Sequence, residues 1–194
     1  MNIVAAVAAA WLEALGAAAG AGERILRTEI VVEGPVEQVW RAWATEEGVR
    51  TFFAPASRIE PRVDGAYEIL FFPEAPPGRR GAEGARLLVL EPPTRIAFTW
   101  DAPPHLPRIR GQRTIVYVDL ARMDERRTRL RFTHLGWGRG ADWDQAYEYF
   151  DHAWSAVVLP RLRERFAHGP IDWARVPKLA PVARTLKAEL TDGR

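Results

Sequence analysis

The feature that most constrains the fold is a strand that stops at a glycine and is followed by one long aromatic helix. The motif Thr-His-Leu-Gly-Trp occupies residues 133–137, and a helical pattern rich in Trp, Tyr and Phe covers residues 143–166. This pattern carries more large aromatic side chains than an exposed helix would. We therefore expect the helix to lie across a curved sheet and to close a cavity there.

The preceding residues supply the strands and short helices that this arrangement needs. A strand is predicted at 25–32, where apolar and polar residues alternate. Pro35 then opens a helix, and Thr45 is placed to cap a second short helix that runs through Phe53. Further strand-like runs follow without long helices between them, which predicts an antiparallel meander. These runs are 56–60, 66–72, 86–91, 95–100, 113–121 and 128–135.

Prolines interrupt these elements at three places. The segments 73–84 and 101–111 each contain three prolines, and we expect both to be loops at the rim of the cavity. Within the long helix, the apolar side chains change direction beyond Pro160. A proline removes one helical hydrogen bond and clashes with the preceding turn, so we expect a bend there.

The composition fits one globular domain and gives no sign of a nucleic-acid surface. Hydrophobic residues make up 47% of the 194 residues and charged residues 27%, which are ordinary values for a soluble globular protein. The 27 basic and 25 acidic residues nearly cancel, and the short arginine clusters fit a solvated hairpin edge. We therefore expect no nucleic-acid partner.

Residue types and spacings exclude several kinds of site. The chain has no cysteine, so disulfides, thiolate zinc sites and cysteine nucleophiles are ruled out. Its four histidines lack the spacing of a metal site, and no phosphate-binding glycine loop or nucleophile elbow is present. The sequence predicts neither a metal nor a cofactor.

Three motifs together resemble a known family. They are the C-terminal third described above, Val-Trp-Arg-Ala-Trp at 39–43 and Arg-Val-Asp-Gly-Ala-Tyr at 62–67. With them the chain, from residue 24 to about 173, resembles the family named for homologues of the activator of the 90-kDa heat-shock protein ATPase. That family belongs to the START-like (SRPBCC) superfamily. The resemblance implies an α+β helix-grip fold, a curved antiparallel sheet wrapped around a long C-terminal helix, with two short helices after the first strand.

Two terminal segments flank the predicted domain at 24–173. Residues 1–22 resemble an export signal in their apolar stretch and small residues, although Glu13 interrupts the pattern and no Lys or Arg precedes it. The alternatives are an alanine-rich helix packed on the domain and an extension from a misassigned start. These features are evenly balanced, and the family resemblance slightly favours an exported or periplasmic protein over a cytoplasmic one. A permanent membrane span is disfavoured because Glu13 would lie near the bilayer centre. The tail at 174–194 has a modest helical pattern.

The candidate site is the inner face of the sheet together with the facing side of the long helix. His134 has the strand parity of Leu130 and Phe132, so all three should point inward. A histidine there could carry protons or bind the polar end of a ligand; alternatively, its ring hydrogen-bonds a backbone group beside Gly136. The other candidate lining residues are Glu68, Phe98, Trp100, Trp143, Tyr147, Phe150 and Trp154. The helix aromatics among them are either close-packed core or cavity lining.

These observations predict a domain that binds a hydrophobic small molecule between sheet and helix and does not catalyse a reaction on it. Two alternatives stay open. One is an enzyme of the cyclase or hydrolase type that uses His134 as acid and base, which would need a second group within hydrogen-bond reach. The other is a protein-interaction domain of the co-chaperone kind, which the family's name suggests.

Overall fold

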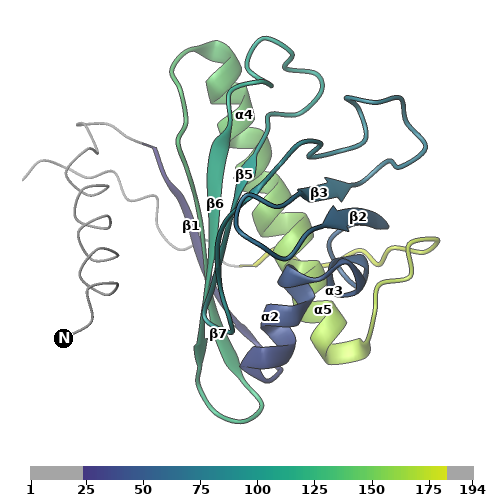
Figure 1. Cartoon of the computed structure of the whole chain (residues 1–194). Helices are drawn as coiled ribbons and strands as arrows, with labels where there is room; N and C mark the ends of the chain where they lie inside the picture. Colours follow the sequence, from purple (N-terminus) through teal and green to yellow (C-terminus); the bar gives the residue numbers. More distant parts are fainter. Residues whose placement is uncertain (1–23, 183–194) are drawn as a thin grey trace, which may run out of the picture.

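A computed structural model describes residues 24–182 and shows a curved five-stranded antiparallel sheet with its helices on one side (Figure 1). The strand order is β1-β7-β6-β5-β4. The strands are β1 (Leu26–Val32), β4 (Leu87–Glu91), β5 (Arg95–Trp100), β6 (Thr114–Arg122) and β7 (Thr128–Leu135). The predicted antiparallel meander is therefore confirmed for β4 to β7, and β1 extends it beside β7.

The first two strands of the predicted meander form a separate ribbon instead. This ribbon consists of β2 (Ala56–Ile59) and β3 (Tyr67–Leu70). The isolated bridge between Ala66 and Arg86 connects this ribbon to the start of β4, and so does the hydrogen bond that the Tyr67 amide donates to the Ala85 carbonyl at 2.8 Å. The ribbon extends the curvature of the sheet without continuing its ladder.

Side chains alternate across the main sheet as the sequence pattern predicts. β1 alternates buried and exposed residues from Leu26 to Val32. Cross-strand partners then form a continuous buried row through Leu26, His134, Val116, Phe98 and Leu87. His134 thus lies on the inner face, as its parity predicts.

Two short helices follow β1, as expected. Pro35 directly precedes α2 (Val36–Ala44), and Thr45 caps α3 (Glu46–Arg50) by accepting a hydrogen bond from the Gly48 amide at 3.0 Å. This bond satisfies one of the amide groups that a helix start leaves free. The two helices cover one end of the inner face.

The long helix crosses the inner side of the sheet in three consecutive parts (Figure 1). These are α4 (Ala141–His152), the π-helical segment η1 (Ala153–Val158) and α5 (Leu159–His168). The helix-grip fold class is confirmed by this arrangement. The bend expected at Pro160 stays a prediction. What the structure shows there is a π-helical segment just before the proline.

The π-helical register explains how the chain after the helix is held. The Leu159 amide bonds to the Trp154 carbonyl, five residues back. The next donor in this register would be residue 160, but proline has no N–H, so the carbonyl of Ser155 lacks a helical partner. The amide of Val182 donates to that carbonyl at 2.9 Å. Val182 is buried in the core.

Residues 1–22, with the predicted export signal, and most of the predicted tail helix lie outside the described residues. In residues 24–182, no helix is both long enough and apolar enough to cross a membrane. The division into a domain at 24–173 and a tail at 174–194 stays a prediction.

Candidate functional site

A cavity of about 460 Å³ lies between the long helix, the end of β5 and the two proline-rich loops. Its aromatic wall contains Trp100 from β5, Phe150 from α4 and Trp154 from η1. The centroids of the Trp100 and Trp154 rings are 5.3 Å apart. Apolar and aromatic walls of this kind, in cavities of this size, are typical of small-molecule sites.

Both predicted rim loops contribute to the lining. The first provides Arg79, Gly81 and Ala82, and the second provides residues 101–104 and Arg110. The chain after α5 closes another side with Trp173 and Val176.

The mouth of the cavity carries exposed apolar side chains. Phe72 is 68% exposed, Tyr149 47% and Val176 40%, and all three line the cavity. Large exposed apolar groups that gather in one place mark a site of interaction.

Of the ten predicted lining residues, the cavity includes Trp100, Phe150 and Trp154. Leu130, Phe132 and Phe98 point inward, but they pack in the close-packed core and do not line it. Phe132 lies against Trp154, with ring centroids 4.6 Å apart, and Phe98 stacks on Tyr67 at 4.3 Å. The inner face therefore has a close-packed part and a part that lines the cavity.

The remaining predicted residues lie in other places. Trp143 packs in a second small cluster with Leu106 and Ile109. The Tyr147 hydroxyl donates to the Ile25 carbonyl at 3.3 Å. Glu68 alternates with the buried Tyr67 and Ile69, so its carboxylate points away from the core and accepts a hydrogen bond from the Gly84 amide at 2.7 Å.

His134 is fully buried and does not line the cavity. The Trp154 indole N–H donates to Nδ1 at 3.0 Å, and Nε2 lies 2.7 Å from the Thr114 hydroxyl oxygen. Because Nδ1 accepts, the proton of the neutral ring is on Nε2 and is donated to Thr114. The Thr114 hydroxyl donates in turn to the Trp100 carbonyl at 3.0 Å.

This chain of bonds uses both nitrogens of the ring. Burial also lowers the pKa of His134 well below its ordinary value, so the ring stays neutral. The bonds orient Trp154 and connect it to Trp100 through β6 and β7. His134 thus lies outside the cavity lining and positions Trp154 and Trp100, two residues of its aromatic wall.

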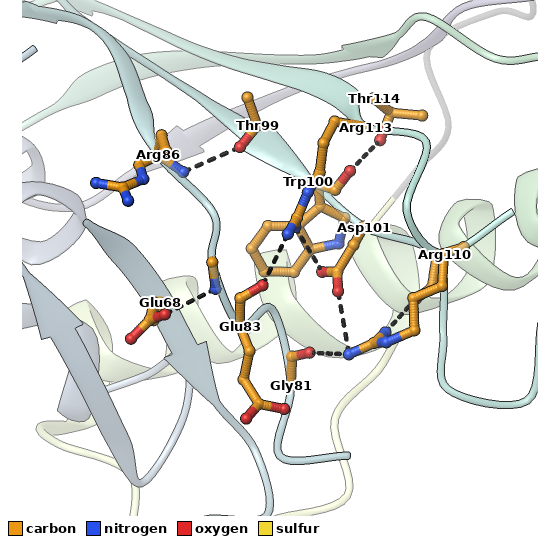
Figure 2. Close-up of polar contacts among 12 residues, drawn as sticks. Glu68, Gly81, Glu83, Arg86, Thr99, Trp100, Asp101, Arg110, Arg113 and Thr114 are labelled. Carbon is orange, nitrogen blue, oxygen red and sulfur yellow. Dashed lines mark hydrogen bonds and ion pairs between the residues drawn. The ribbon is translucent and has the colours of Figure 1, made fainter. Parts of the chain in front are cut away.

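The sequence analysis missed a buried ionic cluster at the cavity's edge. The Asp101 side chain is 4% exposed and forms ion pairs with Arg110 at 3.0 Å and with Arg113 at 3.6 Å (Figure 2). Arg110 also donates to the Gly81 carbonyl at 2.7 Å, and Arg113 donates to the Glu83 carbonyl at 2.9 Å. The cluster therefore holds the two rim loops together.

The pKa of Asp101 lies above the ordinary value for an aspartate. Burial raises the pKa of its carboxyl to about 6, and the two nearby guanidinium groups only partly oppose this effect. A signal for the cluster exists in the sequence, because pairing Trp100 with Thr114 in a hairpin brings Asp101 beside Arg113. Predicting the cluster from this signal requires the register of β5 and β6, and the alternation of apolar and polar residues does not give that register.

Arg161 is a second cationic group that faces the cavity. It lies on α5, is half-buried, and its guanidinium carbon is 5.3 Å from the centre of the Trp173 ring. Burial lowers its pKa from the ordinary arginine value. Within residues 24–182, no group of three His, Asp or Glu side chains is arranged to hold a metal ion.

Comparisons with known proteins agree with this fold. The family model described as Activator of Hsp90 ATPase homolog 1-like protein matches residues 33–167. The chain is similar to protein MLL2253 from Mesorhizobium loti, with 21% identity and a TM-score of 0.56 over 74% of this chain and 93% of that one. It is also similar to the Aha1 dimer from Colwellia psychrerythraea, with 18% identity and a TM-score of 0.55, and the match covers 75% of this chain and 97% of that one. A third similar structure is CalU16 from Micromonospora echinospora, with 19% identity and a TM-score of 0.56, and the match covers 79% of this chain and 81% of that one. No curated protein sequence matches the chain.

Proposed function

The chain belongs to the Activator of Hsp90 ATPase homolog 1-like protein family, as its motifs predict, and we propose that it binds a hydrophobic small molecule in the cavity beside its long helix. One observation carries the proposal. Of the seven large hydrophobic side chains that are exposed in residues 24–182, three surround the mouth of this cavity. A ligand that enters there would cover them and contact the aromatic wall behind.

The proposed role is binding without catalysis. An enzyme that uses His134 as acid and base has less support, because both ring nitrogens are already bonded and the ring is behind the cavity wall. A protein-interaction domain is the other alternative, since the same exposed side chains could contact a protein. A small cavity behind them favours a small ligand.

The test uses the neutral fluorescent probe N-phenylnaphthylamine with two matched variants. Ala153 lines the cavity, whereas Ala167 lies on the same long helix, is exposed and does not line it. We expect the wild type to bind the probe, Ala153→Trp to weaken binding at least about tenfold by filling the cavity, and Ala167→Trp to bind like the wild type.

Two results would contradict the proposal. One is that the wild-type protein does not bind the probe. The other is that Ala153→Trp binds it as tightly as Ala167→Trp does. If neither result is obtained, native mass spectrometry of the protein purified from its own host would identify the natural ligand.

A further inference from the structure

We propose that the ligand is an amphipathic organic anion, whose apolar body lies against the aromatic wall and whose anionic head group binds Arg161. This inference rests on the proposed function and adds the chemical class of the ligand. It is carried by the distribution of charged side chains around the cavity.

Arg161 has hydrogen-bonding capacity that the described protein does not use. A guanidinium has five N–H donors, and the contact found for this one is the face of Trp173. Among residues 24–182, no carboxylate forms an ion pair with Arg161. A half-buried guanidinium loses part of its hydration, and an anion at the same site would compensate for that loss.

The other charges on the lining do not supply this anion. Asp101 is the one carboxylate among the lining residues in the described part of the chain, and it already pairs with Arg110 and Arg113. Arg110 already binds Asp101 and donates to the carbonyls of Gly81 and Ala102. Since Arg79 also lines the cavity, three guanidinium groups face one carboxylate. The cavity therefore favours a negatively charged occupant.

The placement of Arg161 along the helix indicates the shape of the ligand. Phe150, Trp154, Val157, Val158 and Arg161 all line the cavity from the long helix. A helix rises about 1.5 Å per residue, so the aromatic end and the guanidinium are separated by roughly 15 Å. An apolar body with the acidic group at one end fits this order of side chains. A ligand with a central charge does not.

The test compares two probes with nearly the same apolar body. 2-Anilinonaphthalene-6-sulfonate carries a sulfonate at one end of the molecule, and N-phenyl-2-naphthylamine has no charge. Arg161→Gln removes the guanidinium, Arg161→Lys keeps a positive charge, and Arg163→Gln removes the same charge from an exposed position of α5 that does not line the cavity. Fluorescence titrations and thermal melts would be measured for all four proteins.

We expect the wild type to bind the sulfonate more tightly than the neutral probe. Arg161→Gln should weaken sulfonate binding about tenfold and leave the neutral probe unaffected, Arg161→Lys should retain part of the preference, and Arg163→Gln should change neither affinity. The inference is overturned if Arg161→Gln weakens both probes equally, or if Arg161→Gln and Arg163→Gln have the same effect. Failure of the wild type to bind either probe would instead overturn the proposed function.

Discussion

At His134, strand alternation determines the direction of the side chain, and the partners of the ring determine its role. The ring accepts from Trp154 and donates to Thr114, so it is a neutral bridge between the long helix and the sheet. A proton added to Nδ1 would displace the Trp154 indole and place a charge in the core. Acid should therefore destabilise the fold through this residue.

The first prediction concerns the pH dependence of stability. The pKa of His134 is lower in the folded protein than in the unfolded chain, so the unfolded chain binds more protons in acid. Its contribution to the free energy of unfolding is complete above about pH 6.5 and is lost as the pH falls, by up to about 1.4 kcal/mol per pH unit. Urea unfolding of the wild type and of His134→Gln, measured across this range, should show that the variant lacks this loss. Parallel profiles would contradict the assignment.

The second prediction concerns Asp101, and its sign is opposite. The pKa of Asp101 is raised from 3.8 to about 6 in the fold, so its contribution to stability is complete below about pH 4 and decreases as the pH rises through about 6. The decrease amounts to roughly 3 kcal/mol. Asp101→Asn should lack it, so the difference in free energy of unfolding between the two proteins should change by this amount between about pH 4 and pH 7. A constant difference would show that the two arginines cancel the effect of burial.

These two residues show how far a site can be predicted from sequence. The inward direction of His134 follows from a period of two residues along β7, which is a local property. Its function as a bridge depends on Thr114 and Trp154, which only the assembled fold brings to it. Asp101 gave no signal by itself because its two partners come from the far side of a hairpin loop.

At the scale of elements, the strands and helices were predictable because each has its own periodicity. The pairing of the strands was less predictable. Strand-like runs bounded by turn residues identified β2 and β3 but did not show that they form a separate ribbon, because pairing depends on partners far along the chain. The proline in the long helix predicted a bend but gave no indication of the π-helical segment before it. The N–H that Val182 supplies to the Ser155 carbonyl comes from beyond the helix, so the local helical pattern could not reveal it.

The third prediction tests that hydrogen bond. Val182→Ala removes apolar contacts but keeps the amide, whereas Val182→Pro also removes the N–H donor. The buried Ser155 carbonyl would then lack a partner, which costs about 1 kcal/mol or more. We expect Val182→Pro to have a lower free energy of unfolding than Val182→Ala by this amount in urea titrations. Equal values would mean that the bond contributes nothing to the π-helical segment.

At the scale of the whole molecule, the cavity joins segments that are distant in sequence. The two loops, the long helix and the chain after α5 all contribute to its lining. That last chain segment is anchored by the Ile171 amide, which donates to the Thr51 carbonyl at 2.8 Å, and by the Trp173 indole, which donates to the Arg50 carbonyl at 2.7 Å. It therefore connects the α3 end of the sheet to the mouth of the cavity.

The fourth prediction compares chains of residues 24–173 and 24–182, which both lack the N-terminal segment and differ only at residues 174–182. The shorter chain loses the buried Val182 and its bond to Ser155, together with Val176 at the mouth of the cavity. Burial of one valine and one hydrogen bond together contribute about 3 kcal/mol, so its melting temperature should be roughly 5–10 °C lower. It should also bind N-phenylnaphthylamine more weakly, because one apolar wall is missing. If both chains melt at the same temperature and bind the probe equally, the domain ends at 173 and the following segment belongs to neither core nor cavity.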